Sequence, residues 1–187
     1  MDFAPLIQTP RLVLKRPYPV TFALAEEIYE AVDASREHIA EWLPWASTMN
    51  SAEDEFVYLK NYCEKKWDEQ TGFAYMIRRL DDDEFLGMID LVHINHKFFS
   101  TEIGYWLKQS ACGFGYMTEA VLGLEKEAFR QGFHRIVIGN DVKNLKSASV
   151  AKNAGYHLDG IMRDDRFSIA KNRFRSSNVW SKLASEA

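Results

Sequence analysis

The segment from Thr101 to Ala120, TEIGYWLKQSACGFGYMTEA, places the tightest constraint on how this chain can fold. Every second residue from Ile103 to Leu107 is large and apolar, which is the period of a strand. Gly113 and Gly115 follow in a turn of small residues, where glycine permits positive φ. The sequence therefore predicts a strand, a glycine turn and a helix that begins near Tyr116.

Such a turn is suited to an anionic ligand. A helix over 116–129 has free N–H groups in its first turn, and its dipole favours negative charge there. Phosphate groups commonly bind at such helix N-termini. Because glycine has no Cβ, a ligand can also approach the backbone closely. The segment is predicted to hold a diphosphate, the alternative being an ordinary strand-to-helix turn.

Composition limits the class of protein. The 187 residues include 47% hydrophobic and 27% charged residues, which indicates a single globular domain over 1–187. The formal net charge of -4 argues against nucleic-acid binding. Cys63 and Cys112 are too few for a disulfide framework, and no metal-ligand spacing is present. The N-terminus lacks a signal-peptide pattern and no apolar run approaches about 18 residues, so we expect a cytoplasmic protein without membrane contact.

Strand and helix patterns alternate along the chain, which predicts an α+β fold. Asn50 and Glu53 have the spacing of a capping box, and the acidic turn 81–84 joins a predicted hairpin. The predicted strands cover 11–16, 73–80, 85–94, 101–107, 134–139 and 173–183, with strand character also at Phe167. The predicted helices cover 20–32, 35–45, 50–67, 116–129 and 147–153, the last ending at Gly155.

This order of motifs resembles the GNAT superfamily of acetyl-CoA-dependent N-acetyltransferases. The segments TPRLVLKR, EIGYWL, GFGYMTEA and NLKSASVAKNAGY are similar to the RimJ/RimL-type branch, which acetylates protein N-termini, including those of ribosomal proteins. The resemblance extends from about Thr9 to Leu183. It implies a central, mostly antiparallel mixed sheet with a splayed strand pair and helices on both faces.

The resemblance identifies the diphosphate as that of acetyl-CoA, used as a co-substrate without a metal. The family motif Gln/Arg-x-x-Gly-x-Gly/Ala falls on residues 110–115, where Ser110, Ala111 and Cys112 depart from the usual polar or basic residues. Backbone N–H groups are therefore expected to make the contacts. The residues predicted to bind the diphosphate are Cys112, Gly113, Phe114, Gly115, Tyr116 and Met117.

In GNAT folds, the strands corresponding to 102–107 and 134–140 splay apart. The resemblance implies that backbone near Trp106 or Leu107 pairs with the pantetheine arm and holds the oxyanion. Asn140, at the end of the second strand, is placed among the cofactor-binding residues. Gly104 either forms a bulge that starts the splay or meets a packing need.

The catalytic residues implied by the resemblance are Asn144 and Ser147, which match the family's Asn-x-x-Ser. Ser147 is expected to meet the CoA sulfur as the acid, and Asn144 to bond the pantetheine or anchor its loop. Both residues are also suitable helix caps. The tyrosine that many members carry further along this helix is replaced by Ala151.

The proton acceptor is not identified by the sequence. An α-amino group has a pKa of about 7.7–8.0, so a water relay to Glu102, His134 or another carboxylate suffices. Arg166 stands where RimL-like members place a glutamate, beside the candidates Asp164 and Asp165.

The expected function is transfer of the acetyl group of acetyl-CoA to an amine, most plausibly the N-terminal α-amino group of a ribosomal or other protein. The alternatives are acetylation of a small amine, such as an aminoglycoside, a polyamine or an amino-acid conjugate, and a non-catalytic CoA-binding domain. The aromatic cluster Trp42–Trp45 lines the acceptor pocket or packs its helical arm. The protein is expected to be a monomer or a homodimer.

Overall fold

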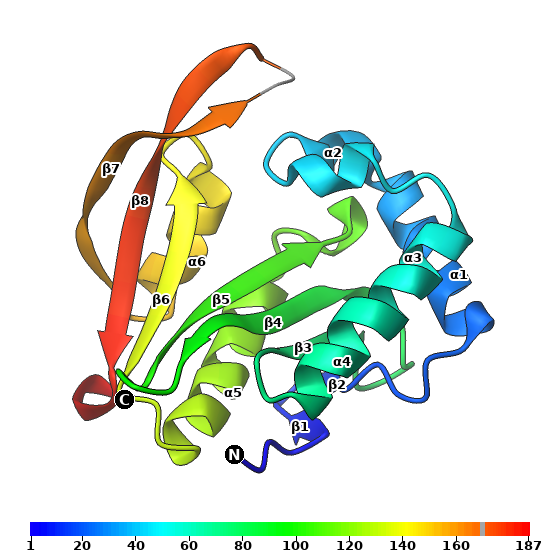
Figure 1. Cartoon of the computed structure of the whole chain (residues 1–187), viewed down its shortest axis with the longest axis horizontal. Helices are drawn as coiled ribbons and strands as arrows, with labels where there is room; N and C mark the ends of the chain where they lie inside the picture. The colour runs from blue at the N-terminus through cyan, green and yellow to red at the C-terminus, as the bar shows by residue number, and fades with distance from the viewer. Residues whose placement is uncertain (169–170) are drawn as a thin grey trace.

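Eight strands form one sheet in the order β1-β2-β3-β4-β5-β6-β8-β7 (Figure 1). This computed structural model describes residues 1–168 and 171–187. All neighbouring strands are antiparallel except β5 and β6, which are parallel, so the predicted mostly antiparallel mixed sheet is confirmed. The strands are β1 (Leu6–Gln8), β2 (Leu12–Lys15), β3 (Phe73–Arg79), β4 (Phe85–Asn95), β5 (Ser100–Leu107), β6 (Arg135–Asp141), β7 (His157–Ser168) and β8 (Arg173–Leu183).

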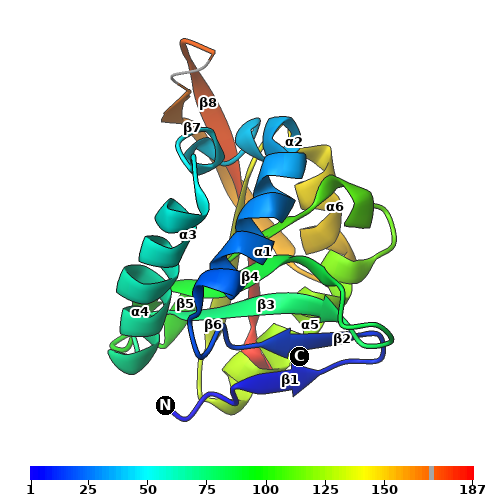
Figure 2. The same ribbon diagram turned by 90° about the vertical axis from the view of Figure 1, so that its right-hand side faces the viewer.

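Helices cover both faces of the sheet (Figures 1 and 2). The α-helices are α1 (Phe22–Ala34), α2 (Arg36–Ala40), α3 (Ala52–Tyr58), α4 (Lys65–Asp68), α5 (Tyr116–Arg130) and α6 (Leu145–Asn153). A π-helical segment, η2 (Leu59–Glu64), joins α3 to α4, and short 3₁₀ turns are η1 (Pro44–Ser47), η3 (Gln109–Ala111) and η4 (Ala184–Glu186). None of the helices within the described residues is long and apolar enough to span a membrane.

Two apolar cores hold these layers together, because the strands alternate their side chains between both faces. On β3, Tyr75 and Ile77 enter the core shared with α5 and α6, together with Leu124 of α5. The neighbouring Ala74 and Met76 enter the core that lies under α1 and α3. A strand buried on both faces reads as a continuous apolar run, which is why 73–80 is recognisable in the sequence.

The sheet opens between β5 and β6, as the resemblance to GNAT folds implies. The two strands pair only from Ser100 with Arg135 to Glu102 with Val137. Beyond that point they diverge, which Figure 1 shows as a V between the green and yellow arrows. The β6 side of β5 is therefore without a strand partner over its last five residues, 103–107. This open region is called the split below.

Gly104 does not form the bulge that was one of its two expected roles. It pairs with Asp90 in an unbroken stretch of the β4–β5 ladder, and the irregularity lies between Val92 and Asn95. A Cβ at Gly104 would lie 2.5 Å from Asp90 Oδ1. The glycine therefore makes room for the Asp90 side chain, which is a packing requirement.

Other differences from the sequence predictions have local causes. Ser51, rather than Asn50, caps α3, since its hydroxyl accepts from Asp54 N at 3.2 Å. The strand β7 is much longer than the single predicted position at Phe167, because almost all of its residues are exposed and show no alternation of apolar and polar residues. The strand β1 has only three residues and was not predicted.

Candidate active site

The glycine turn adopts the expected left-handed conformation. Gly113 has φ +91° and Gly115 has φ +79°, and Gly115 is the N-cap of α5 without a side-chain cap. A Cβ on Gly113 would meet no atom within 4 Å. Among the described residues, no protein acceptor is bound by the backbone N–H groups of 113–118. This open backbone surface has the donors that a diphosphate requires.

Arg11 is a neighbour of this turn that the sequence analysis did not single out. Its Nη1 donates to Phe114 O at 3.0 Å, and its Nε pairs with Glu119 at 2.7 Å. Its guanidinium also lies 4.8 Å from the ring centroid of Tyr116. The arginine thus holds the turn against the start of α5. Arg11 belongs to the TPRLVLKR motif near the N-terminus. The sequence does not indicate that this motif contacts the glycine turn, which lies about 100 residues further along the chain.

The atypical residues before the glycines have structural surroundings. Ala111 is buried in the core beside α5. Cys112 Sγ lies 3.4 Å from His38 Nε2, and burial raises the pKa of the Cys112 thiol. Ser35 Oγ accepts from Gln109 N at 3.0 Å, which joins the α1–α2 region to this turn. A protonated thiol is a poor nucleophile, so Cys112 is best described as a small loop residue.

Ser147 and Asn144 lie together at the start of α6. Asn144 is the N-cap, and its Oδ1 accepts from Ser147 N at 3.0 Å. The Ser147 hydroxyl is not used for capping, since its Oγ lies 2.9 Å from Tyr105 Oη on β5. Tyr105 and Ser147 therefore face each other across the split. Strand periodicity alone made Tyr105 look like a core residue, and the sequence analysis missed it.

Asn140 lies near the end of β6 and bonds the loop that leads to Asn144 and Ser147. It is 5% exposed, and its Oδ1 accepts from Trp180 Nε1 at 2.8 Å. Its Nδ2 donates to Asp141 O at 2.7 Å and to Asn144 O at 3.2 Å. Both amide hydrogens are thus used within the protein. The side chain fixes the loop that leads into α6, and through it the position of Ser147.

The predicted residues of β5 lie on different faces. Trp106 packs against Trp45 and Phe85, with ring centroids 6.1 and 5.8 Å apart. Leu107 packs against the core beside α5. Their backbone belongs to the part of β5 that has no pairing with β6.

The tryptophans of the 42–45 cluster have separate roles. Trp45 packs against Trp106, as above, while Trp42 lies under the guanidinium of Arg175, 5.1 Å from its ring centroid. Arg175 Nη1 also donates to Glu41 O at 3.0 Å, and its Nε pairs with Asp141 at the end of β6. Arg175 thereby connects α2 to β6 at the open end of the split. No motif in the sequence indicates this.

Glu102 lies where β5 and β6 separate. One carboxylate oxygen is 3.0 Å from His93 Nδ1, and the other would be 3.3 Å from a Cβ at Gly139. Arg166 Nη2 would lie 3.5 Å from that same Cβ. His134, by contrast, precedes β6 at the paired end, where its N–H donates to Phe99 O. Glu102 is therefore the better placed of the two predicted bases.

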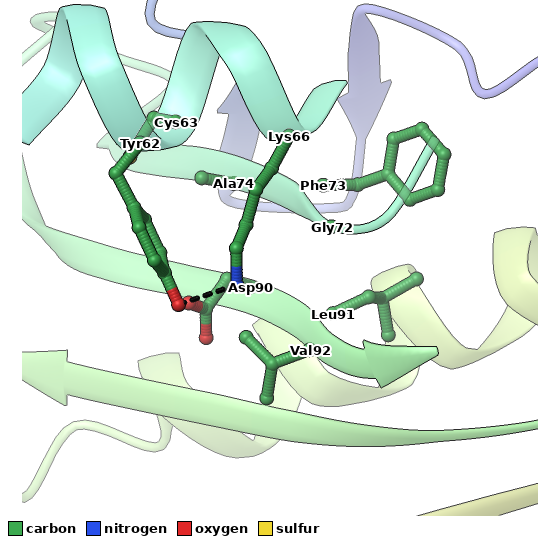
Figure 3. A pocket seen from close by; sticks show the side chains of 9 residues that line it. All are labelled: Tyr62, Cys63, Lys66, Gly72, Phe73, Ala74, Asp90, Leu91 and Val92. Atoms are coloured by element: carbon green, nitrogen blue, oxygen red, sulfur yellow. Dashed lines mark hydrogen bonds between the residues drawn. The ribbon is translucent and has the colours of Figure 1, made fainter. Parts of the chain in front are cut away.

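Asp90 is a further carboxyl group on the same face as Glu102. Figure 3 shows Tyr62 and Lys66 reaching from the helical layer toward it, with Lys66 Nζ donating to Tyr62 Oη at 2.6 Å. Together with β3 they line a cavity of about 10 Å³, close to the size of one water molecule. Burial raises the pKa of Asp90 to about 7, opposed by Lys66 and reinforced by Glu102. Asp90 interrupts an apolar strand, but that signal alone did not identify it.

Glu55 on α3 is the second carboxyl group in this layer with a raised pKa. It is 2% exposed, its Oε1 has no hydrogen-bond partner among the described residues, and burial raises its pKa to about 7. Carboxyl groups that titrate near neutral pH are typical of proton-transfer sites. Within the described part of the chain, no group of three or more His, Cys, Asp or Glu residues is arranged to hold a metal ion.

A split parallel pair inside an otherwise antiparallel sheet, with a left-handed glycine turn at the next helix, defines a GNAT-type transferase. Residues 11–157 match the family model described as an acetyltransferase (GNAT) domain. The chain belongs to this family of acetyltransferases.

The names of two relatives specify the acceptor that those proteins acetylate. The chain is 28% identical over 157 residues to a ribosomal-protein-serine acetyltransferase of Escherichia coli K12, covering 83% of this chain and 85% of that protein. It is 27% identical over 141 residues to the putative ribosomal N-acetyltransferase YdaF of Bacillus subtilis 168, covering 75% and 76%.

Solved structures show the same fold. RimL, a ribosomal L7/L12 α-N-protein acetyltransferase in complex with coenzyme A, superposes with a TM-score of 0.87 at 20% identity, covering 95% of this chain and 97% of that one. The microcin C7 self-immunity acetyltransferase MccE, in complex with acetyl-CoA and AMP, superposes with a TM-score of 0.84 at 23% identity, covering 93% of each chain.

Proposed function

We propose that this protein transfers the acetyl group of acetyl-CoA to the α-amino group at the N-terminus of a protein, with ribosomal proteins as the first class to test. The open backbone surface at 113–118 carries the donor half of the proposal. The acceptor half is supported by the relatives named as ribosomal-protein acetyltransferases. The proposed compartment is the cytoplasm, where ribosomal proteins are synthesised.

The residues present fit acetyl-CoA. Backbone N–H groups from Gly113 to Met117 are proposed to hold its diphosphate, and Arg11 fixes the turn that carries them. Cys112 was also predicted to contribute, but its N–H donates to Gln109 O at 3.2 Å. The unpaired edge of β5 at Trp106 and Leu107 is proposed to pair with the pantetheine arm. Asn144 fixes the loop beside that arm. Acetyl-CoA supplies the activated acetyl group.

Proton transfer is proposed to involve groups on both sides of β5. The Ser147 hydroxyl donates to the departing sulfur, since it is the side-chain donor at the split that capping leaves free. Glu102 and Asp90 receive the proton that the amine loses, directly or through water. Because Asp90 has a pKa of about 7, an ionised fraction is available at neutral pH.

A small-amine acceptor is the second candidate. MccE, described as a microcin C7 self-immunity acetyltransferase, superposes with a TM-score of 0.84, compared with 0.87 for RimL. Arg166, 57% exposed, also brings a cation to the region beside Glu102 and Gly139. Among the small amines, a cation beside the acceptor region favours an amino-acid conjugate, which can carry a negatively charged group, over a cationic aminoglycoside or polyamine.

The release of free thiol from acetyl-CoA, measured across a panel of acceptors, tests the proposal. The panel contains peptides that begin with Ser, Ala, Met or Asp and the same peptides with blocked N-termini. It also contains small amines: aminoglycosides, polyamines and amino-acid conjugates. We expect turnover with unblocked peptides and none with blocked ones. Turnover with small amines alone would support the second candidate. Tight binding of CoA without turnover on any acceptor would indicate a non-catalytic domain.

A further inference from the structure

We propose that Tyr105 is a positioning residue for the acid: its phenol donates to Ser147 Oγ and directs the serine's own hydrogen into the split. The inference rests on the proposed function and adds a residue to its mechanism. It concerns a contact between β5 and α6, two elements that are 42 residues apart at this point.

The geometry carries the proposal. Tyr105 Oη lies 2.9 Å from Ser147 Oγ and 3.3 Å from Ser147 O. Both contacts are hydrogen bonds, and the shorter one, within the usual range for O–H···O, is the stronger of the two. A phenol is more acidic than an aliphatic hydroxyl, so it is the better donor of the two. The direction from Tyr105 to Ser147 is therefore favoured.

The neighbouring residues fix this arrangement. Ser147 N–H is held by the Asn144 cap at 3.0 Å, so the first turn of α6 is anchored. Ala151, one turn further along α6, is fully buried in the core against which Tyr105 packs. Burial raises the pKa of Tyr105 to about 12, so the phenol stays protonated at any pH used for an assay. Each of these contacts lies within the protein.

The consequence for the reaction is a two-proton relay. When the carbon–sulfur bond breaks, its electron pair goes to sulfur. Ser147 Oγ gives its proton to that sulfur and takes the phenol proton from Tyr105. Tyr105 is left as a phenolate, which regains a proton from water. Without Tyr105, Ser147 alone would have to become an alkoxide, which is a much stronger base than a phenolate.

The first test measures the ionisation of the thiol of bound CoA, which needs no acceptor. The ultraviolet absorbance of the thiolate is titrated with pH, and the titration of the protein without CoA is subtracted. A donor pair facing sulfur stabilises the thiolate and lowers its pKa. We expect Tyr105→Phe to raise the pKa of the bound thiol by about 0.5 to 1 unit. The affinity for CoA at pH 7 should change less than about twofold, because the thiol is then protonated in both proteins.

The second test measures kcat with the peptide that the wild type acetylates fastest. Tyr105→Phe should lower kcat about 10- to 100-fold while the KM for acetyl-CoA is retained. The loss should shrink with acetyl-seleno-CoA, because a selenolate is a weaker base and needs no proton on departure. The Tyr105→Phe/Ser147→Ala double variant should be no slower than Ser147→Ala alone, since the two residues act as one unit.

Tyr75→Phe is the matched control. Tyr75 is a buried sheet tyrosine whose hydroxyl donates to Ala4 O at 2.8 Å, away from the split. It should change neither the thiol pKa nor the ratio of rates for the thioester and the selenoester. This separates the relay from the general effect of removing a buried hydroxyl.

The results that overturn the inference differ from those that overturn the proposed function. An unchanged thiol pKa in Tyr105→Phe sinks the inference, and so does a double variant whose loss is the product of the single losses. If the wild type acetylates no amine, the proposed function fails, but the thiol titration still decides the role of Tyr105.

Discussion

The two faces of β5 differ in the chemistry they present. The face toward α6 has the hydroxyl donors Tyr105 and Ser147, 2.9 Å apart. The face toward α3 has the carboxyl groups Glu102 and Asp90. Tyr105 and Glu102 point to opposite faces of β5, because their positions differ by an odd number of residues. Ser147 on α6 and Asp90 on β4 lie on the corresponding sides of the sheet. A leaving thiolate needs donors and an attacking amine needs a proton acceptor, so this separation lets both operate in a single protein state.

The largest effect is expected from a substitution in the glycine turn, where the diphosphate of acetyl-CoA is proposed to bind. Gly115→Asp places a side chain on a left-handed residue and a negative charge at the proposed diphosphate site. We expect acetyl-CoA affinity to fall at least about 100-fold by calorimetry, equivalent to about 2.7 kcal/mol. The control Gly132→Asp introduces the same change at another left-handed glycine, φ +93°, beyond the end of α5. If both variants lose affinity equally, the diphosphate does not bind at Gly115.

The next effect concerns the acid itself. Ser147→Ala should lower kcat about 100-fold and leave the affinity for acetyl-CoA nearly unchanged. Ser149→Ala is the control, because its hydroxyl bonds Leu145 O on the same helix. An unaltered kcat in Ser147→Ala would remove this residue from the mechanism.

A smaller effect is expected on the carboxyl side. The pKa of Asp90 is about 7 and its base form is the ionised one, so the rate should rise with pH through 7. Asp90→Asn should lower kcat/KM about tenfold and flatten that rise. The pH profile of Asp81→Asn, a change in the exposed β3–β4 turn, serves as the comparison. A rise near pH 7 that persists without Asp90 would assign it to another group.

The smallest effect is on stability. The pKa of Glu55 is raised to about 7 in the folded protein, so its contribution to stability is full below its unfolded pKa and is lost as pH rises through 7. Glu55→Gln should therefore raise Tm at pH 8 by about 2–4 °C. At pH 4.5 it should change Tm little.

Glu53→Gln provides the control, because Glu53 is exposed in the first turn of the same helix. Equal shifts of Tm at both pH values in Glu55→Gln would show that burial of the charge is not the cause.

Sequence patterns predicted some parts of this protein well because those parts depend on local geometry. Left-handed glycines at Gly113 and Gly115 and the period of α5 are properties of short segments. The predicted cap of α3 was wrong by one residue, because Asn50 and Ser51 are both suitable caps. The structure starts the helix at Ala52, so that Ser51 accepts from Asp54 N. The strand β7 was mostly missed because its edge position leaves its residues exposed.

The site residues show the same division. Ser147 and Asn144 were identified from their spacing, but their contacts were not. Asn140 was placed among the cofactor-binding residues, but the contacts of its amide with the loop before α6 were not predicted. The sequence did not identify three further residues of the site, because their roles depend on partners that are distant in the chain. These residues are Tyr105, Asp90 and Arg175.

The sequence by itself determined the family, the glycine turn, the helix that follows and the serine at the next helix start, because these are set by local backbone preferences and by motif spacing. Only the tertiary structure decided which side chains meet at the split. The absence of a side chain at Gly104 leaves room for Asp90, and the Tyr105 hydroxyl lies within hydrogen-bond distance of Ser147. The reason is physical: burial, pKa and hydrogen-bond direction depend on the neighbours that folding brings together, and sequence distance does not record them.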